Sequence, residues 1–172
     1  MNRQLLRGRA DWPQPFRFLP KPIFEPRRPA LAVPVAWLTT FIPSIVLGAL
    51  VTTLLSGLEQ PKLPLDTGMA LFMVAVFAPV VETLIMVGVL TLLLRFLPPP
   101  AAVLASSIGW GIAHSLAAPA WGLVIWWPFL IFSILYVTWR QRSLLAALAI
   151  PATVHGLQNL VPALLVFGGI SV

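Results

Sequence analysis

Five long apolar runs follow one another along the chain, separated by short polar or proline-rich breaks. They cover residues 31–56, 69–94, 101–116, 121–137 and 144–167. A helix needs about 20 residues to cross a hydrocarbon core of about 30 Å, and most of these runs reach that length. The pattern therefore predicts an all-α fold, a polytopic membrane bundle of about five transmembrane helices.

The breaks between the runs contain strong helix terminators. Residues 57–68 form a polar loop, three consecutive prolines follow Arg95, and the third run ends in the small residues AAPA. The fourth run closes on an interfacial signature: Trp139, Arg140, Gln141 and Arg142. Because proline removes a backbone donor, Pro43 and Pro151 are expected to bend the first and last runs. For the last run, an interfacial piece before Pro151 and a spanning piece after it stay an open alternative.

Composition agrees with a chain that lies in lipid. Hydrophobic residues make up 59%, charged residues 9%, and the mean hydropathy is +0.93, whereas about a quarter of the residues of soluble domains are charged. This excludes a globular enzyme with a water-facing surface. The chain has no cysteine, which excludes a disulfide scaffold, a thiolate metal cluster and a cysteine nucleophile.

Most of the net charge of +6 lies before the first apolar run. Residues 1–28 hold seven Lys or Arg and two Asp or Glu, which leaves +5 there. Six prolines in residues 1–30 forbid a continuous helix, so we expect an extended basic arm over residues 1–30, followed by a transmembrane domain over residues 31–172. Aromatic rings alternate with the cations of the arm: Trp12, Phe16, Phe18 and Phe24.

Rings interleaved with cations suit the headgroup zone of an anionic leaflet or a groove on a partner protein. A disordered tail is the alternative. Nucleic acid is excluded as a partner, because no base-reading module accompanies the charge. Since Lys and Arg accumulate in cytoplasmic loops, the arm, Arg95, Arg140 and Arg142 predict a cytoplasmic N-terminus and, with five spans, a C-terminus on the opposite side.

Few strongly polar or ionisable side chains remain at membrane depth. They are Glu82, His114, His155, Gln158 and Asn159. A carboxylate there costs several kcal/mol unless it is paired or hydrated, so it indicates function, with neutral hydrogen-bonded glue between helices as the alternative. Glu82, His114 and His155 each lie 13 or 14 residues from the basic or proline boundary of their run, which is about 20 Å of helix. The spacing predicts that the three share one layer.

Helical spacing adds neighbours to this layer. Asn159 follows His155 by four residues, so both lie on one helix face. Ser107, Gly111 and Ser115 form a stripe of small residues that allows another helix to approach closely. We therefore expect the helix over residues 101–116 to be central in the bundle.

A buried carboxylate and two imidazoles support two chemistries. In the first, Glu82 and a histidine activate water for attack on a carbonyl, while His155 and Asn159 donate to the developing oxyanion. In the second, Glu82, His114 and His155 ligate a divalent metal such as zinc. Both lead to hydrolysis, and spacing does not choose between them. No Ser or Thr stands out beside a general base, which disfavours a covalent nucleophile.

Three short motifs resemble those of the CAAX protease and bacteriocin-processing (CPBP, or Abi) family of intramembrane proteases. That family's first motif reads about A-P-x-x-E-E-x-x-F-R-G, and residues 78–88 read APVVETLIMVG. The second, F-x-x-x-H, resembles residues 110–114, and the third, H-x-x-x-N, resembles residues 155–159. The order and helix placement also match, so the resemblance covers a core of about residues 68–165.

The resemblance implies that Glu82 and His114 activate water and that His155 and Asn159 stabilise the oxyanion. Two positions depart from the family pattern, since Thr83 stands in place of its second Glu and Val87 in place of its Arg. The two losses are consistent with each other, because an Arg without an acidic partner would be an unpaired buried cation.

Three functions are compatible with these residues. The first is an intramembrane peptidase that cleaves a membrane-associated peptide. The second is a catalytically impaired relative that acts as a structural or assembly subunit of a larger membrane complex, which the missing Glu and Arg favour. A proton or ion carrier is third, since a single intramembrane acid makes a poor relay.

Overall fold

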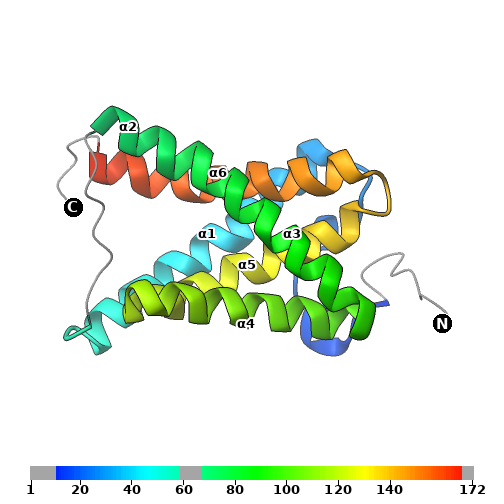
Figure 1. Cartoon of the computed structure of the whole chain (residues 1–172), viewed down its shortest axis with the longest axis horizontal. Coiled ribbons are helices and arrows are strands. Elements are labelled where there is room, and N and C mark those ends of the chain that lie inside the picture. Colours follow the sequence, from blue (N-terminus) through cyan, green and yellow to red (C-terminus); the bar gives the residue numbers. More distant parts are fainter. Residues whose placement is uncertain (1–10, 59–66, 168–172) are drawn as a thin grey trace.

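A computed structural model describes residues 11–58 and 67–167, and these form a bundle of long helices without strands (Figure 1). The long helices are α1 (Pro29–Leu54), α3 (Ala78–Phe96), α4 (Pro99–Ala117), α5 (Pro119–Trp139) and α6 (Leu144–Phe167). A short α2 (Thr67–Phe72) and a π-helical turn (Met73–Phe77) lead directly into α3. The predicted all-α polytopic fold is confirmed. The first ten residues of the predicted arm and residues 59–66 of the predicted polar loop lie outside the described residues.

Prolines set the beginnings of several helices. α1, α4 and α5 each have proline at the first helical position, where its missing N–H would have no helical partner. Prolines inside helices do not divide them, since α1 continues through Pro43 and α6 continues through Pro151. The last apolar run is therefore one helix in the structure and not two pieces.

Four helices are long and apolar enough to cross a membrane: Pro29–Leu54, Gly68–Phe96, Pro119–Trp139 and Leu144–Leu165. They make the protein an integral membrane protein. The predicted fifth span, α4, is not among them, because its Ser, Gly, Pro and His residues lower its mean hydropathy. It nevertheless presents an exposed apolar ridge at four-residue spacing: Leu104, Ile108, Ile112 and Leu116.

The central helix is α5, and the expectation that α4 would be central is wrong. Residues 128–139 of α5 are all buried, whereas one face of α4 is exposed. α5 is apolar on every side, as a helix surrounded by others must be. α4 packs against α5. The small-residue stripe of α4 therefore contacts one neighbouring helix, and α4 is not surrounded by helices.

Close approach of α4 and α5 depends on Gly122. A Cβ atom built at Gly122 would overlap the Ser115 hydroxyl oxygen and the Gly111 carbonyl oxygen. Gly111 in turn faces Trp126 of α5, whose Cβ would lie 3.0 Å from an added methyl group. The predicted role of the stripe as a close-packing surface is thus confirmed, with α5 as the neighbour.

Replacing Gly122 by Ala is expected to lower the free energy of unfolding by about 1–3 kcal/mol, because overpacking forces the two helices apart. Gly109→Ala is the matched control, since nothing lies within 4 Å of its Cβ position. There the change should be neutral or stabilising by up to about 1 kcal/mol, the difference in helix propensity. Thermal unfolding of both variants in detergent micelles measures the contrast. Equal midpoints would contradict this account of the interface.

The arm differs from the expectation that its rings face lipid headgroups or a partner. It forms two short 3₁₀ helices, Gln14–Phe16 and Lys21–Phe24, and the second packs against α1 and α5. Trp12, Phe16 and Phe24 are buried in the core of the chain itself, and Phe18 is exposed. Prolines exclude a long helix, yet the short 3₁₀ helices direct three of the rings inward and leave the charged side chains of residues 11–28 exposed.

Basic residues gather at one end of the bundle. Residues 11–28 of the arm, the end of α3 with Arg95, and the α5–α6 connection with Arg140 and Arg142 lie together there (Figure 1). This arrangement is the one that the positive-inside prediction requires. The side of the membrane on which this end lies stays a prediction.

Candidate active site

A cavity of about 410 Å³ lies inside the bundle, between α1, α4, α5, α6 and the continuous helix Gly68–Phe96 that contains α3. All four predicted site residues line it, together with Gln158. Its walls are otherwise mostly apolar and aromatic, and they include Phe41, Trp121, Ile125, Phe129 and Phe132. Three helices thus bring Glu82, His114 and the His155–Asn159 pair to one space, as their common depth in the sequence predicts.

Glu82 and His155 face each other across the contact between α3 and α6. His155 Nε2 lies 3.6 Å from Glu82 Oε2. The His155 side chain is only 4% exposed, whereas that of Glu82 is 26% exposed. The imidazole is held between rings of α5, stacked on Phe132 at 4.6 Å and met by Phe129 at 5.2 Å, close to perpendicular. Both side chains line the cavity, and the carboxylate is the more exposed member of the pair.

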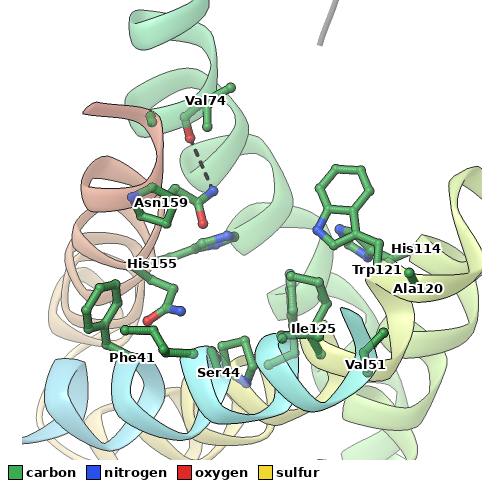
Figure 2. A pocket seen from close by; sticks show the side chains of 18 of the residues that line it. Phe41, Ser44, Val51, Val74, His114, Ala120, Trp121, Ile125, His155 and Asn159 are labelled. Atoms are coloured by element: carbon green, nitrogen blue, oxygen red, sulfur yellow. Dashed lines mark hydrogen bonds between the residues drawn. The ribbon is translucent and has the colours of Figure 1, made fainter. Parts of the chain in front are cut away.

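His114 stands on the opposite wall, beside Trp121 (Figure 2). Its Nδ1 lies 2.9 Å from the Trp110 carbonyl oxygen, one turn earlier in α4. Because a carbonyl oxygen only accepts hydrogen bonds, Nδ1 carries the proton of the neutral ring. The Nε2 lone pair of His114 is then the acceptor, and Phe129 packs against both histidine rings.

Asn159 is oriented by a backbone carbonyl. Its Nδ2 donates to the Val74 carbonyl oxygen at 3.2 Å (Figure 2). An amide nitrogen carries two hydrogens, so this bond fixes the side chain and leaves the second N–H for another acceptor.

The π-helical turn makes that carbonyl available. In the turn, the Ala78 N–H bonds to the Met73 carbonyl instead of to Val74. The next position is Pro79, which has no N–H to offer. Val74 is therefore left without a helical donor, and Asn159 supplies one. Single π-helical turns of this kind are common at functional sites.

Gly156 allows α6 to approach the same turn. In a regular α-helix the Ala75 carbonyl oxygen would accept from the N–H of residue 79, but Pro79 has none. This oxygen lies 3.0 Å from the position that a Cβ atom on Gly156 would occupy. A side chain there would push α6 away from α3. Gly156 thus sets how closely Asn159 approaches Val74.

Pro79→Ala is expected to lower kcat for the reaction proposed below by about tenfold, the value of one hydrogen bond. An alanine N–H allows regular α-helical bonds to form. The Val74 carbonyl then accepts a hydrogen bond within its own helix and no longer accepts one from Asn159. Pro43→Ala in α1 is the control, because Pro43 does not line the cavity. If Asn159 is the group affected, Pro79→Ala adds no further loss to an Asn159→Ala background. Equal kcat for wild type and Pro79→Ala would contradict this role.

Gln158 has a structural part in the described chain. Its Oε1 accepts a hydrogen bond from the Thr40 hydroxyl at 2.8 Å, which joins α6 to α1. Sequence reasoning recognised its polarity at membrane depth but not this contact. It also missed the aromatic wall of α5 and the carbonyl of Val74. The Ala-Pro pair at residues 78–79 was the available signal for the turn, because proline must leave a carbonyl without a donor.

The three side chains considered as zinc ligands, Glu82, His114 and His155, do not come together around one point. Among the described residues, no three His, Cys, Asp or Glu side chains lie close enough together to hold a metal ion. Glu82 contacts His155, while His114 lies across the cavity beside Trp121. The geometry therefore favours the carboxylate and the imidazoles acting directly over a zinc site made of Glu82, His114 and His155.

The two positions that depart from the resembled motif lie on α3 behind the site. Thr83 is 2% exposed, and its hydroxyl has no hydrogen-bond partner among the described residues. Val87 is partly buried against the hydrophobic core. Both side chains are uncharged, so neither position holds a member of the family's ion pair.

One family model matches the chain over residues 64–161, and its description is type II CAAX prenyl endopeptidase Rce1-like. This is more than half of the 172 residues and includes every predicted site residue. No curated protein and no solved structure matches the chain.

Proposed function

The chain belongs to the Rce1-like family of type II CAAX prenyl endopeptidases, and from this premise we propose that it is an intramembrane peptidase. The observation that carries the proposal is the convergence of Glu82, His114, His155 and Asn159 on one cavity within a membrane bundle. The substrate class is a membrane-associated peptide whose scissile bond enters that cavity.

Glu82 is the general base in this proposal. Its carboxylate is the acidic group that lines the cavity, and a water placed between it and the His114 Nε2 lone pair would be oriented by both. Glu82 takes a proton as the water oxygen bonds to the peptide carbonyl carbon. When the C–N bond breaks, the protonated carboxyl returns that proton to the leaving amine.

His155 and Asn159 act on the oxyanion. They lie one helical turn apart on α6, and both line the cavity. Asn159 is held by the Val74 carbonyl with one N–H left over, and His155 is fixed between rings. Rigid donors aimed at the developing negative charge lower the barrier without reorganising during the reaction.

The apolar walls suit this chemistry. Aromatic and aliphatic side chains around the site strengthen electrostatic interactions with the oxyanion, since an apolar surrounding has a lower dielectric constant than water. The same walls would accept the apolar part of a lipid-modified peptide. The test is cleavage of a fluorogenic prenylated CAAX peptide by the purified protein in proteoliposomes, with Glu82→Gln as the inactive comparison.

A second candidate is a non-catalytic subunit of a membrane complex. The observation that favours it is the replacement of the family's second Glu and Arg by the uncharged, buried or partly buried Thr83 and Val87. The arm does not add support, because three of its four rings, Trp12, Phe16 and Phe24, are buried within the chain. Equal and negligible cleavage by wild type and Glu82→Gln, with stoichiometric co-purification of another membrane protein, would favour this candidate.

A further inference from the structure

A second cavity of about 360 Å³ lies at the basic end of the bundle, far along α3 and α5 from the candidate active site. Its lining comes from three helices: Thr91, Leu94 and Arg95 of α3, Tyr136 and the following Arg140 of α5, and Leu144 of α6. Two guanidinium groups, two hydroxyl groups and two leucines thus share one small space.

Neither arginine is neutralised within the described chain. No carboxylate of residues 11–58 and 67–167 lies within ion-pair distance of Arg95 or Arg140. Arg140 is placed over the Tyr136 ring, with its guanidinium carbon 5.9 Å from the ring centre. The Tyr136 hydroxyl is fixed by Thr91 at 2.8 Å, so the wall between the cations is preorganised.

The surroundings of the cavity are those of the membrane interface. Large apolar side chains beside it are strongly exposed, with Phe96 at 77%, Leu144 at 67% and Leu145 at 77%. Such side chains suit acyl chains, and paired arginines suit phosphate, which they bind through charge-assisted and bidentate hydrogen bonds. Basic pockets between membrane helices are a common kind of lipid headgroup site.

We propose that this cavity binds a phosphate group carried by an anionic phospholipid, with Arg95 and Arg140 as its ligands. The acyl chains then lie along the exposed apolar residues at the ends of α3 and the start of α6. The site is separate from the peptidase cavity, and the proposal does not depend on the peptidase activity.

The test measures lipid retention by native mass spectrometry of the purified full chain in detergent micelles. The probes are dioleoyl phosphatidylglycerol and dioleoylglycerol, which has the same chains without phosphate. Wild type is expected to retain the phosphatidylglycerol and not the dioleoylglycerol. Arg95→Gln with Arg140→Gln should weaken phosphatidylglycerol binding by about tenfold or more, since two cations near the headgroup are lost.

The control removes the same charge at the same end of the bundle. Arg27 and Arg142 lie outside the cavity, where Arg142 Nη1 approaches the Arg27 carbonyl oxygen at 3.5 Å. Arg27→Gln with Arg142→Gln should change binding by less than about twofold, because only screened surface charge is lost. Equal weakening in both double variants would overturn the proposal, since binding would then follow overall charge.

Two further measurements keep the result decisive. Sodium phosphate distinguishes the source of the phosphate: displacement of phosphatidylglycerol by it would show a site for the free anion and overturn the lipid assignment. If the double Gln variant does not fold, Arg95→Lys with Arg140→Lys keeps the charge and loses bidentate geometry. Reduced retention in the folded Lys variant supports the site, and unchanged retention overturns the role of the guanidinium groups.

Discussion

Replacing Glu82 by Gln is expected to lower kcat/KM for peptide cleavage by about 10²–10⁴-fold, the usual contribution of a general base. Gln has the same shape and fills the same place opposite His155. It takes no proton from water, so the loss falls on the chemical step and not on folding. The measurement is the cleavage rate of a fluorogenic membrane peptide in proteoliposomes, with thermal unfolding measured alongside.

Glu25→Gln is the matched control for this substitution. Glu25 is an exposed carboxylate in the arm, outside the cavity. Its loss should leave the cleavage rate unchanged within about twofold, because surface charges are screened by salt. If Glu82→Gln cleaves as fast as wild type while both variants unfold at the same temperature, water activation by Glu82 is wrong.

Depth was the property of the site that the sequence predicted best. Glu82, His114 and His155 lie at similar distances from the basic or proline ends of their runs, and all three line one cavity. Helical rise converts sequence separation into depth with little error, even where proline occurs inside the helix. Direction around the helix is different, since His114 lies across the cavity and does not complete a metal set with the other two.

The position of a helix within the bundle could not be read from its small residues. The stripe of Ser107, Gly111 and Ser115 specifies one close neighbour, and the structure supplies one, at Gly122. Centrality requires apolar contact on every side, which α5 has and α4 lacks. A single close-packed face is therefore evidence for a contact and not for a place at the centre.

The arm shows a similar limit. Its prolines correctly exclude a long helix, but the direction of its rings depends on which apolar surface is nearest. Trp12 and Phe24 find one on their own chain, where they also contact each other at 5.4 Å. Burial of the rings in the core of their own chain loses no translational or rotational freedom of a second molecule, whereas binding to a groove on a partner protein does. Binding of the arm to anionic headgroups stays a prediction.

Removing the Asn159 amide is expected to lower kcat by about 10²–10³-fold, the typical loss for one oxyanion donor. Asn159→Ala deletes both N–H groups, and Asn159→Asp keeps the shape while replacing donors by acceptors. Both variants should lose kcat with little change in KM, because the oxyanion exists only after attack. Asp should be at least as damaging, since its carboxylate also repels the Val74 carbonyl that Asn159 now contacts.

Thr153→Ala is the control on the same helix. Its exposed hydroxyl bonds to the Ala149 carbonyl of α6 and does not line the cavity, so kcat should stay within about twofold of wild type. A rise in KM at constant kcat in Asn159→Ala would assign the amide to substrate binding and not to the oxyanion. Because the bond to the Val74 carbonyl fixes the orientation of the second N–H of Asn159, the π-helical turn of one membrane helix and the proposed donor of another act as a unit.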